Sequence, residues 1–220
     1  STTGVVLPPD DPELQVIAVH HRATPVGGEF NTVPFLPHEN DNTLADDVPG
    51  SSDTAAVSLA NDYTVSLTES QGLDKVIITN NGSKVTVNAA GHRFTPGQIF
   101  VGYVENDNAT LIANGRDFEA NSVTLGEGGI GKLLISGATD FTTGAFTTKS
   151  VGSEARITRA GVNKIDLGRI NMDGGSLVID GFPTDNLLTI GFSSLIMENA
   201  RVDLINGGSM DANSETEILI

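Results

Sequence analysis

Apolar residues recur along the second half of the chain at intervals of about 23 residues. One series has steps of 24 and 23 and consists of Phe94, Phe118 and Phe141. A second has steps of 23, 22 and 22 and consists of Ile112, Ile135, Ile157 and Ile179. A third pairs an aliphatic residue with glycine, at Val101-Gly102, Leu125-Gly126, Leu167-Gly168 and Ile190-Gly191, with no member near Thr148. A shared period of roughly 20 to 50 residues indicates a solenoid or a similar repeat array.

Within each repeat, apolar and polar positions alternate over short runs such as 123–125, and glycine-rich turns separate these runs. Alternation with period two indicates strands that have one buried face. A short repeat cannot bury that face alone, but stacked repeats can, because each strand pairs with its copy about 4.8 Å away. The sequence therefore predicts an all-β fold, a parallel β-helix (β-solenoid) of about six coils. We expect Ile112, Ile135, Ile157 and Ile179 to face inward in one column.

Proline and glycine divide the chain into two parts. Seven of the nine prolines lie in the first 49 residues, and 21 of the 25 glycines lie from Gly72 onward. Because proline blocks ladder pairing and favours open conformations, residues 1–60 are predicted to form an extended, Pro-rich anchoring arm. Residues 61–220 are predicted to form the β-solenoid domain.

The net charge of −16 argues against a partner with a negatively charged surface. Phosphate binding needs clustered Lys and Arg, so we expect no nucleic-acid partner. No run of 18 apolar residues occurs, so we expect no membrane insertion. Ser1 to Gly4 have neither the charged start nor the apolar core of a secretory signal. We therefore expect either a signal that was removed or only an initiator methionine before Ser1.

The tetrad Glu-Asn-Asp-Asn occurs at residues 39–42 and again at 105–108. Dense carboxylate and amide oxygens are the ligands that calcium prefers, which makes Glu39, Asp41, Glu105 and Asp107 candidate calcium ligands. Asn and Asp are also the ordinary residues of turns, and the spacing is not that of an EF-hand. The sequence favours turns and no cofactor, with calcium as the alternative.

Two further patterns resemble enzyme sites. Arg93, Asp117 and Asp140 each precede a phenylalanine of the first series, so stacking should place them in one outward column about 5 Å apart. Such carboxylates suit sugar-cleaving chemistry, but a surface ladder in which Arg93 relieves the Asp117–Asp140 repulsion is the simpler interpretation. Residues 126–131 match G-x-G-x-x-G, yet a strand pattern follows instead of the required helix, which favours a solenoid corner. We predict no catalytic residue and no enzymatic activity.

The stretch from Gly97 to Gly144, centred on Val-Thr-Leu-Gly-Glu-Gly-Gly-Ile-Gly-Lys-Leu-Leu-Ile-Ser-Gly, resembles the glycine-rich β-helical repeats of bacterial autotransporter passengers. Similar repeats are found in phage virion spikes and head-decoration proteins. The resemblance covers about half of the chain and implies a scaffold that binds, presents or stiffens. Members of these groups lie on the bacterial surface, are secreted, or form part of a virion.

The missing signal and the Pro-rich arm favour a structural or attachment protein of the phage virion surface, a head decoration (cement) protein or a spike. Such an arm suits anchoring to a neighbouring subunit or shell. The expected partners are other protein subunits, of a capsid or a cell surface, and a homo-oligomer, with a trimer favoured. The alternatives are a passenger fragment of a secreted autotransporter-type adhesin and a β-helical polysaccharide lyase or hydrolase.

Overall fold

The computed structural model describes a chain built of strands and turns, with no helix among the described residues. These are residues 2–4, 18–20, 51–52, 54–57, 62–67, 70–79, 82, 84–89, 91–115, 117–136, 139–158, 164–181 and 188–219. The predicted extended course of the arm falls almost entirely on residues outside these ranges and stays a prediction.

The strands form two sheets. The larger sheet contains β1 (Thr2–Gly4), β2 (Ala18–His20), β3 (Thr54–Val57), β5 (Gln71–Ile78), β7 (Phe94–Val101), β9 (Phe118–Leu125), β11 (Phe141–Thr148), β13 (Ile165–Asp166), β14 (Arg169–Asp173), β16 (Leu188–Glu198) and β18 (Gly208–Leu219). The smaller sheet contains β4 (Tyr63–Ser66), β6 (Lys84–Asn88), β8 (Asn108–Asn114), β10 (Ile130–Ile135), β12 (Glu154–Thr158), β15 (Ser176–Asp180) and β17 (Arg201–Ile205).

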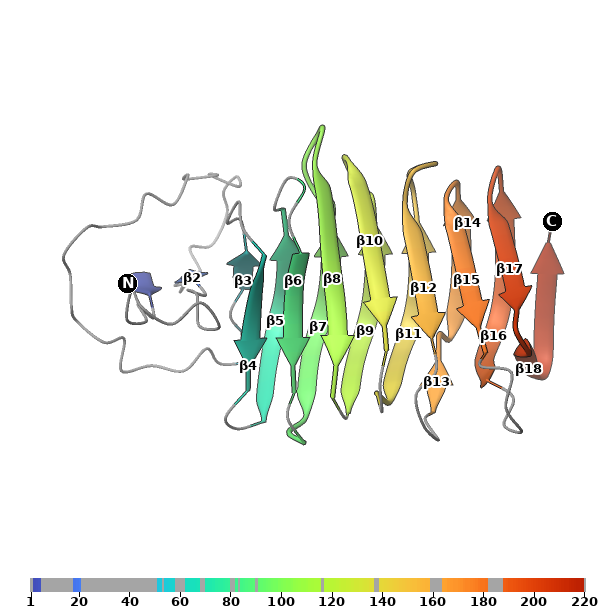
Figure 1. Cartoon of the computed structure of the whole chain (residues 1–220), viewed down its shortest axis with the longest axis horizontal. Coiled ribbons are helices and arrows are strands. Elements are labelled where there is room, and N and C mark those ends of the chain that lie inside the picture. The colour runs from blue at the N-terminus through green and yellow to red at the C-terminus, as the bar shows by residue number, and fades with distance from the viewer. Residues whose placement is uncertain are drawn as a thin grey trace.

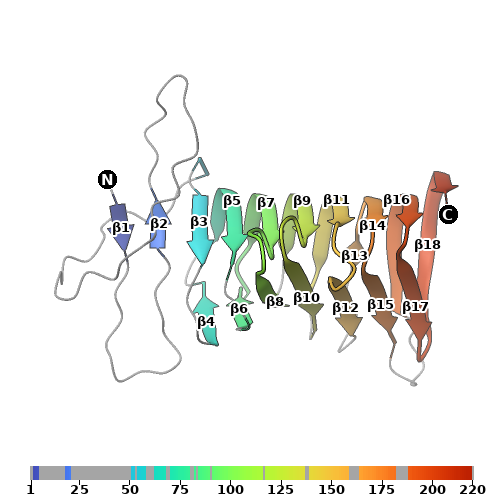
Figure 2. The ribbon, with the colours of Figure 1, turned by 90° about the horizontal axis from the view of Figure 1, so that it is seen from above.

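The chain passes from one sheet to the other and back, and from β3 onward each strand pairs in parallel with the strand one coil away (Figures 1 and 2). In the larger sheet, Gln71 pairs with Phe94, Phe94 with Phe118, and Phe118 with Phe141, at steps of 23, 24 and 23 residues. The stack makes about six turns. The predicted parallel β-solenoid with a repeat of about 23 residues is confirmed.

Each long strand of the larger sheet bends in the middle. In β9, Phe118 and Ala120 are buried, and so are Val123 and Leu125, but the two residues between these pairs, Asn121 and Ser122, both face outward. Two successive outward residues break the alternation of a flat strand and mark a corner. Each coil therefore has three faces, which we number 1 (118–120 in this coil), 2 (123–125) and 3 (β10).

Glycine occupies this corner where neighbouring coils come closest. A Cβ on Gly97 would lie 2.6 Å from the carbonyl oxygen of Asp74, and one on Gly144 would lie 2.9 Å from that of Asn121. Distances below 3.0 Å are too short for a carbon beside a backbone oxygen, so only glycine fits without a shift of the coils.

The predicted phenylalanine ladder is present inside face 1. The ring centroids of Phe94 and Phe118 lie 5.6 Å apart, and those of Phe118 and Phe141 lie 6.2 Å apart. In register, Phe141 is followed by Ile165 and then by Ile190, so the apolar column continues through the later coils. Like-on-like stacking of large side chains fills the core at this level.

The predicted isoleucine column is wrong at its first member. Ile135 pairs with Ala113 on one side and with Ile157 on the other, and Ile157 pairs with Ile179. Ile112 pairs instead with Leu134 and is only half-buried, on the outside of face 3. The step between β8 and β10 is 22 residues, whereas Ile112 and Ile135 are 23 apart. A shift of one residue moves a side chain to the opposite face of a strand.

The predicted aliphatic-glycine series holds for its first two members only. Val101 pairs with Leu125, Leu125 with Thr148, and Thr148 with Met172, so the position that seemed empty is occupied by a buried threonine. Ile190 pairs with Ile165 and belongs to the phenylalanine ladder. Leu167 lies two residues after Ile165, level with Thr143, so the series combined three columns that share a period but not a register.

The amino-terminal side of the larger sheet includes strands from the predicted arm. β3 pairs in parallel with β5, so the parallel stack begins within the segment that the sequence assigned to the arm. β2 pairs antiparallel with β3, and β1 antiparallel with β2, beside the first coil (Figure 2). These two short strands cover the first edge of the larger sheet.

Candidate functional site

The turn formed by residues 102–107 connects face 2 to face 3 and contains two of the predicted calcium ligands. Glu105 is exposed, whereas Asp107 is buried, with 4% of its surface exposed. The turn closes through the N–H of Asp107, which donates to the carbonyl oxygen of Val104 (3.2 Å), and it needs Asn106 in the left-handed region (φ 62°). Asn tolerates this conformation better than most residues, which explains its place here.

The carboxylate of Asp107 has one satisfied and one unsatisfied oxygen. Oδ1 accepts a hydrogen bond from the N–H of Asn108 (2.9 Å), and the buried Oδ2 has no hydrogen-bond partner. Burial raises the pKa of Asp107 above its ordinary value, and the hydrogen bond from Asn108 opposes this only in part. Loss of hydration disfavours the charged form of a carboxyl group, which is the direction found here.

The two candidate calcium ligands within the described ranges, Glu105 and Asp107, do not belong to a cluster of metal-ligating side chains. Glu105 and Asp107 differ in exposure, and no group of three His, Asp or Glu side chains placed to hold a metal ion exists within the described ranges. Glu39 and Asp41 lie outside those ranges, so calcium binding there stays a prediction.

The predicted column of Arg93, Asp117 and Asp140 exists at the backbone level. Phe94 N–H donates to the Asp117 carbonyl oxygen and Phe118 N–H to that of Asp140, each at 2.9 Å. The side chains differ from the expectation, because the ion pair of Arg93 is with Glu119 (3.8 Å). Oδ1 of Asp140 accepts a hydrogen bond from the N–H of Lys164 (2.7 Å). One carboxylate of the column is thus engaged by backbone.

The glycines of residues 126–131 form a corner, as the strand pattern after them predicted. Gly128 and Gly129 donate backbone N–H bonds of 3.3 and 3.1 Å to the carbonyl oxygen of Gly102 in the neighbouring coil. A Cβ on Gly131 would overlap the carbonyl oxygen of Val101. The following residues form β10 and not a helix, so the element that presents pyrophosphate-binding N–H groups in dinucleotide sites is missing.

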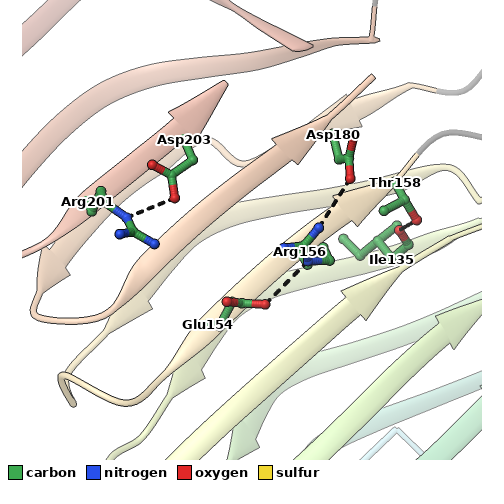
Figure 3. Close-up of polar contacts among 7 residues, drawn as sticks. All are labelled: Ile135, Glu154, Arg156, Thr158, Asp180, Arg201 and Asp203. Carbon is green, nitrogen blue, oxygen red and sulfur yellow. Dashed lines mark hydrogen bonds and ion pairs between the residues drawn. The ribbon is translucent and has the colours of Figure 1, made fainter. Parts of the chain in front are cut away.

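Face 3 carries a group of ion pairs that the sequence did not point to (Figure 3). Arg156 contacts Glu154 (3.5 Å) and Asp180 (3.1 Å), and Arg201 contacts Asp203 (2.8 Å). Val178 lies in register between Arg156 and Asp203 on this outer side, yet only 3% of it is exposed. The aliphatic parts of long charged side chains can cover an apolar residue, so we infer that these side chains shield Val178 from solvent.

No family model, no curated protein and no solved structure matches this chain. The part of the chain that the structure describes contains no helix long and apolar enough to cross a membrane. The class of the protein therefore follows from its fold, which is that of a β-solenoid repeat protein.

Proposed function

We propose that this protein is a non-catalytic structural or attachment protein of the phage virion surface, a head decoration (cement) protein or a spike, anchored through its N-terminal arm. The observation that carries the proposal is that several of its carboxylates form ion pairs or accept backbone hydrogen bonds. Asp140 accepts a backbone hydrogen bond, and Glu154, Asp180 and Asp203 are held in the ion pairs of Figure 3. Ion pairs and backbone hydrogen bonds of this kind stiffen a rod, and they favour a structural role over a set of acid, base and nucleophile that converge on one point.

The position of the arm supports anchoring at one end of the rod. The only described parts of the arm before residue 51 are β1 and β2, which lie beside the first coil. An arm that leaves from an end can reach a shell or a neighbouring subunit while the solenoid projects away from it. Residues 1–50 contain eight acidic residues and one arginine, which favours a basic receiving surface.

The main alternative is a passenger fragment of a secreted autotransporter-type adhesin on the bacterial surface. The resemblance of residues 97–144 to passenger repeats supports it as much as it supports a virion protein. A polysaccharide lyase or hydrolase is the third candidate, and the outward column of Asp117 and Asp140 is the observation that favours it.

The location of the native protein distinguishes the first two functions. An antibody raised against residues 54–219 should label purified virus particles from the source culture in immunogold electron microscopy. Label on the bacterial envelope, with unlabelled particles, would instead identify a cell-surface passenger. The matched control is serum depleted on the same polypeptide, which should label neither.

A further inference from the structure

Asparagine is followed directly by glycine at three places in the chain, residues 81–82, 114–115 and 206–207. Such a pair is chemically labile, because glycine has no side chain to hinder the attack of its backbone nitrogen on the asparagine amide. The reaction needs a free side-chain amide and a free glycine N–H, and a hydrogen bond to either group opposes it. The contacts of the three pairs therefore decide which of them reacts.

Two of the pairs are held by hydrogen bonds. In the first pair, the N–H of Gly82 donates to the carbonyl oxygen of Asn108 in the next coil (2.8 Å), so the attacking nitrogen is engaged. In the third pair, Nδ2 of Asn206 donates to Oδ1 of Asp180 (2.7 Å), and Asp180 is itself fixed by Arg156 (3.1 Å). The amide of Asn206 must break this bond before it can turn toward the following glycine.

The pair at residues 114–115 is held in neither way. Asn114 is the last residue of β8, and its side chain is exposed. Its amide group forms no hydrogen bond with the described residues, and neither does the N–H of Gly115. Both groups that the reaction needs are thus available.

A threonine side chain accounts for the free N–H of Gly115. At the equivalent corner after β15, the N–H of Gly181 donates to the carbonyl oxygen of Ile205 in the next coil (3.0 Å). After β8 the equivalent acceptor is the carbonyl oxygen of Ser136, one residue beyond the paired strands. This oxygen accepts the hydroxyl of Thr139 instead (2.7 Å), which leaves Gly115 without that partner.

We infer that Asn114 is a site of spontaneous deamidation, and that the fold protects Asn81 and Asn206. The nitrogen of Gly115 attacks Cγ of Asn114. A C–N bond forms, the Cγ–Nδ2 bond breaks, and ammonia leaves with the proton that Gly115 loses. Water from the solvent then opens the cyclic imide at either carbonyl group, which gives aspartate or isoaspartate. Nothing is oxidised or reduced in these steps.

The product changes the corner between β8 and β9. Either form adds a negative charge, and the isoaspartate form also lengthens the main chain by a carbon atom. The carbonyl oxygen of Asn114 accepts the N–H of Ala89 in the preceding coil (2.9 Å), and this contact depends on the course of the backbone. We therefore expect faster hydrogen exchange at Ala89 in the isoaspartate form. This inference does not depend on the proposed virion function.

Peptide mapping of the aged full chain tests the inference. The protein is incubated at mildly alkaline pH, digested at acidic pH and analysed by mass spectrometry, with a parallel sample in urea that gives the rates of the unfolded chain. In the folded chain, Asn114 should react within a few-fold of its unfolded rate. Asn81 and Asn206 should react about tenfold more slowly than in urea, as expected where a hydrogen bond must first break.

The matched variant is Asn114→Gln, which keeps the amide but reacts slowly because the ring it must form is larger. It should show only the slow reactions of the other two pairs and unchanged exchange at Ala89. Retention of the Asn114 amide in the folded chain would overturn the proposal, as would equal rates at all three pairs or faster loss at Asn206. If Asn114→Gln does not fold, the comparison of the folded and urea-treated parent decides alone.

Discussion

At the scale of single residues, the side of the strand that a residue faces determines its effect on stability. Ile135 and Ile112 are the same residue type on adjacent strands of face 3, but Ile135 is 2% exposed and faces the core, while Ile112 is half-buried on the outside. They form a matched pair for a test of register.

We predict that Ile135→Asp unfolds the stack or lowers its free energy of unfolding by several kcal/mol, because it buries an unpaired charge. Ile112→Asp should lower it by less than about 1 kcal/mol, as is usual for surface substitutions. Urea denaturation followed by circular dichroism measures both. Equal losses in the two variants would mean that the register of β8 against β10 is wrong.

A second prediction at this scale concerns the outward carboxylates. Asp140 is engaged by the backbone of Lys164, so we expect no turnover of acidic or neutral polysaccharides by the parent chain. The check is a screen for new reducing ends and for the ultraviolet absorbance of unsaturated sugar products. Turnover that disappears in the Asp117→Asn, Asp140→Asn double variant, with an unchanged melting temperature, would support the lyase or hydrolase alternative, and asparagine is chosen because Asp117 has a positive φ (59°).

The sequence placed a residue correctly in the fold only where the spacing of its series matched the register of the strands. The phenylalanine ladder was predictable because three large, uncommon residues share one register. Ile112 was misplaced because the number of residues per coil varies. A difference of one residue moves a side chain from the inner to the outer face of its strand. The burial of Asp107 was not predictable, since Asn and Asp in a turn ordinarily face solvent. The ion pairs of Arg156 depend on which strands are neighbours, which the sequence pattern did not resolve.

At the scale of elements, the coils are positioned by glycine at points of close approach. The sequence indicated strands separated by glycine-rich turns, and this holds at residues 126–131, 174–175 and 207–208. It did not indicate the bend within β9 and its equivalents, because the corner is made by two successive outward residues and not by a turn motif. Coil steps such as 22 between β10 and β12 and 25 between β15 and β17 show that the corners absorb small insertions.

We predict that Gly131→Ala destabilises the stack far more than Gly191→Ala. A Cβ on Gly131 would overlap the carbonyl oxygen of Val101, which neighbouring backbone holds in place, so the coils must separate. The atoms nearest to a Cβ on Gly191 would be those of the Asp166 carboxylate, at the ordinary contact distances of 3.4 to 3.6 Å. Overpacking of this kind typically costs about 1 to 3 kcal/mol.

Thermal melts of the two variants measure the difference. Gly191→Ala serves as the control for the change from glycine to alanine within a strand. A Gly131→Ala variant as stable as the parent would show that β10 does not approach β7 as closely as described.

At the scale of the whole molecule, the solenoid is a rod with a net charge of −16 on the full chain and with different structures at its two ends. At the first end, β1 and β2 extend the larger sheet in the antiparallel sense. Proline content predicted that the arm extends to residue 60, but composition could not show that residues 54–57 already pair with the first coil. Strand pairing is a tertiary property that local composition does not encode.

Assembly through the arm gives the last prediction. Residues 1–50 contain apolar groups, among them Phe35-Leu36, in a segment rich in proline and acidic residues. A homotrimer held by such groups would bury them and would form a closed assembly, which avoids open-ended association. We expect the full chain to be trimeric in multi-angle light scattering, and Phe35→Ala, Leu36→Ala to shift it to monomer. This double variant keeps β1 and β2, which deletion of residues 1–50 would remove. The control is Asn40→Ala, Asn42→Ala, which changes two polar residues of the same segment and should remain trimeric. A monomeric full chain whose arm resists protease would show instead that the arm packs on its own solenoid.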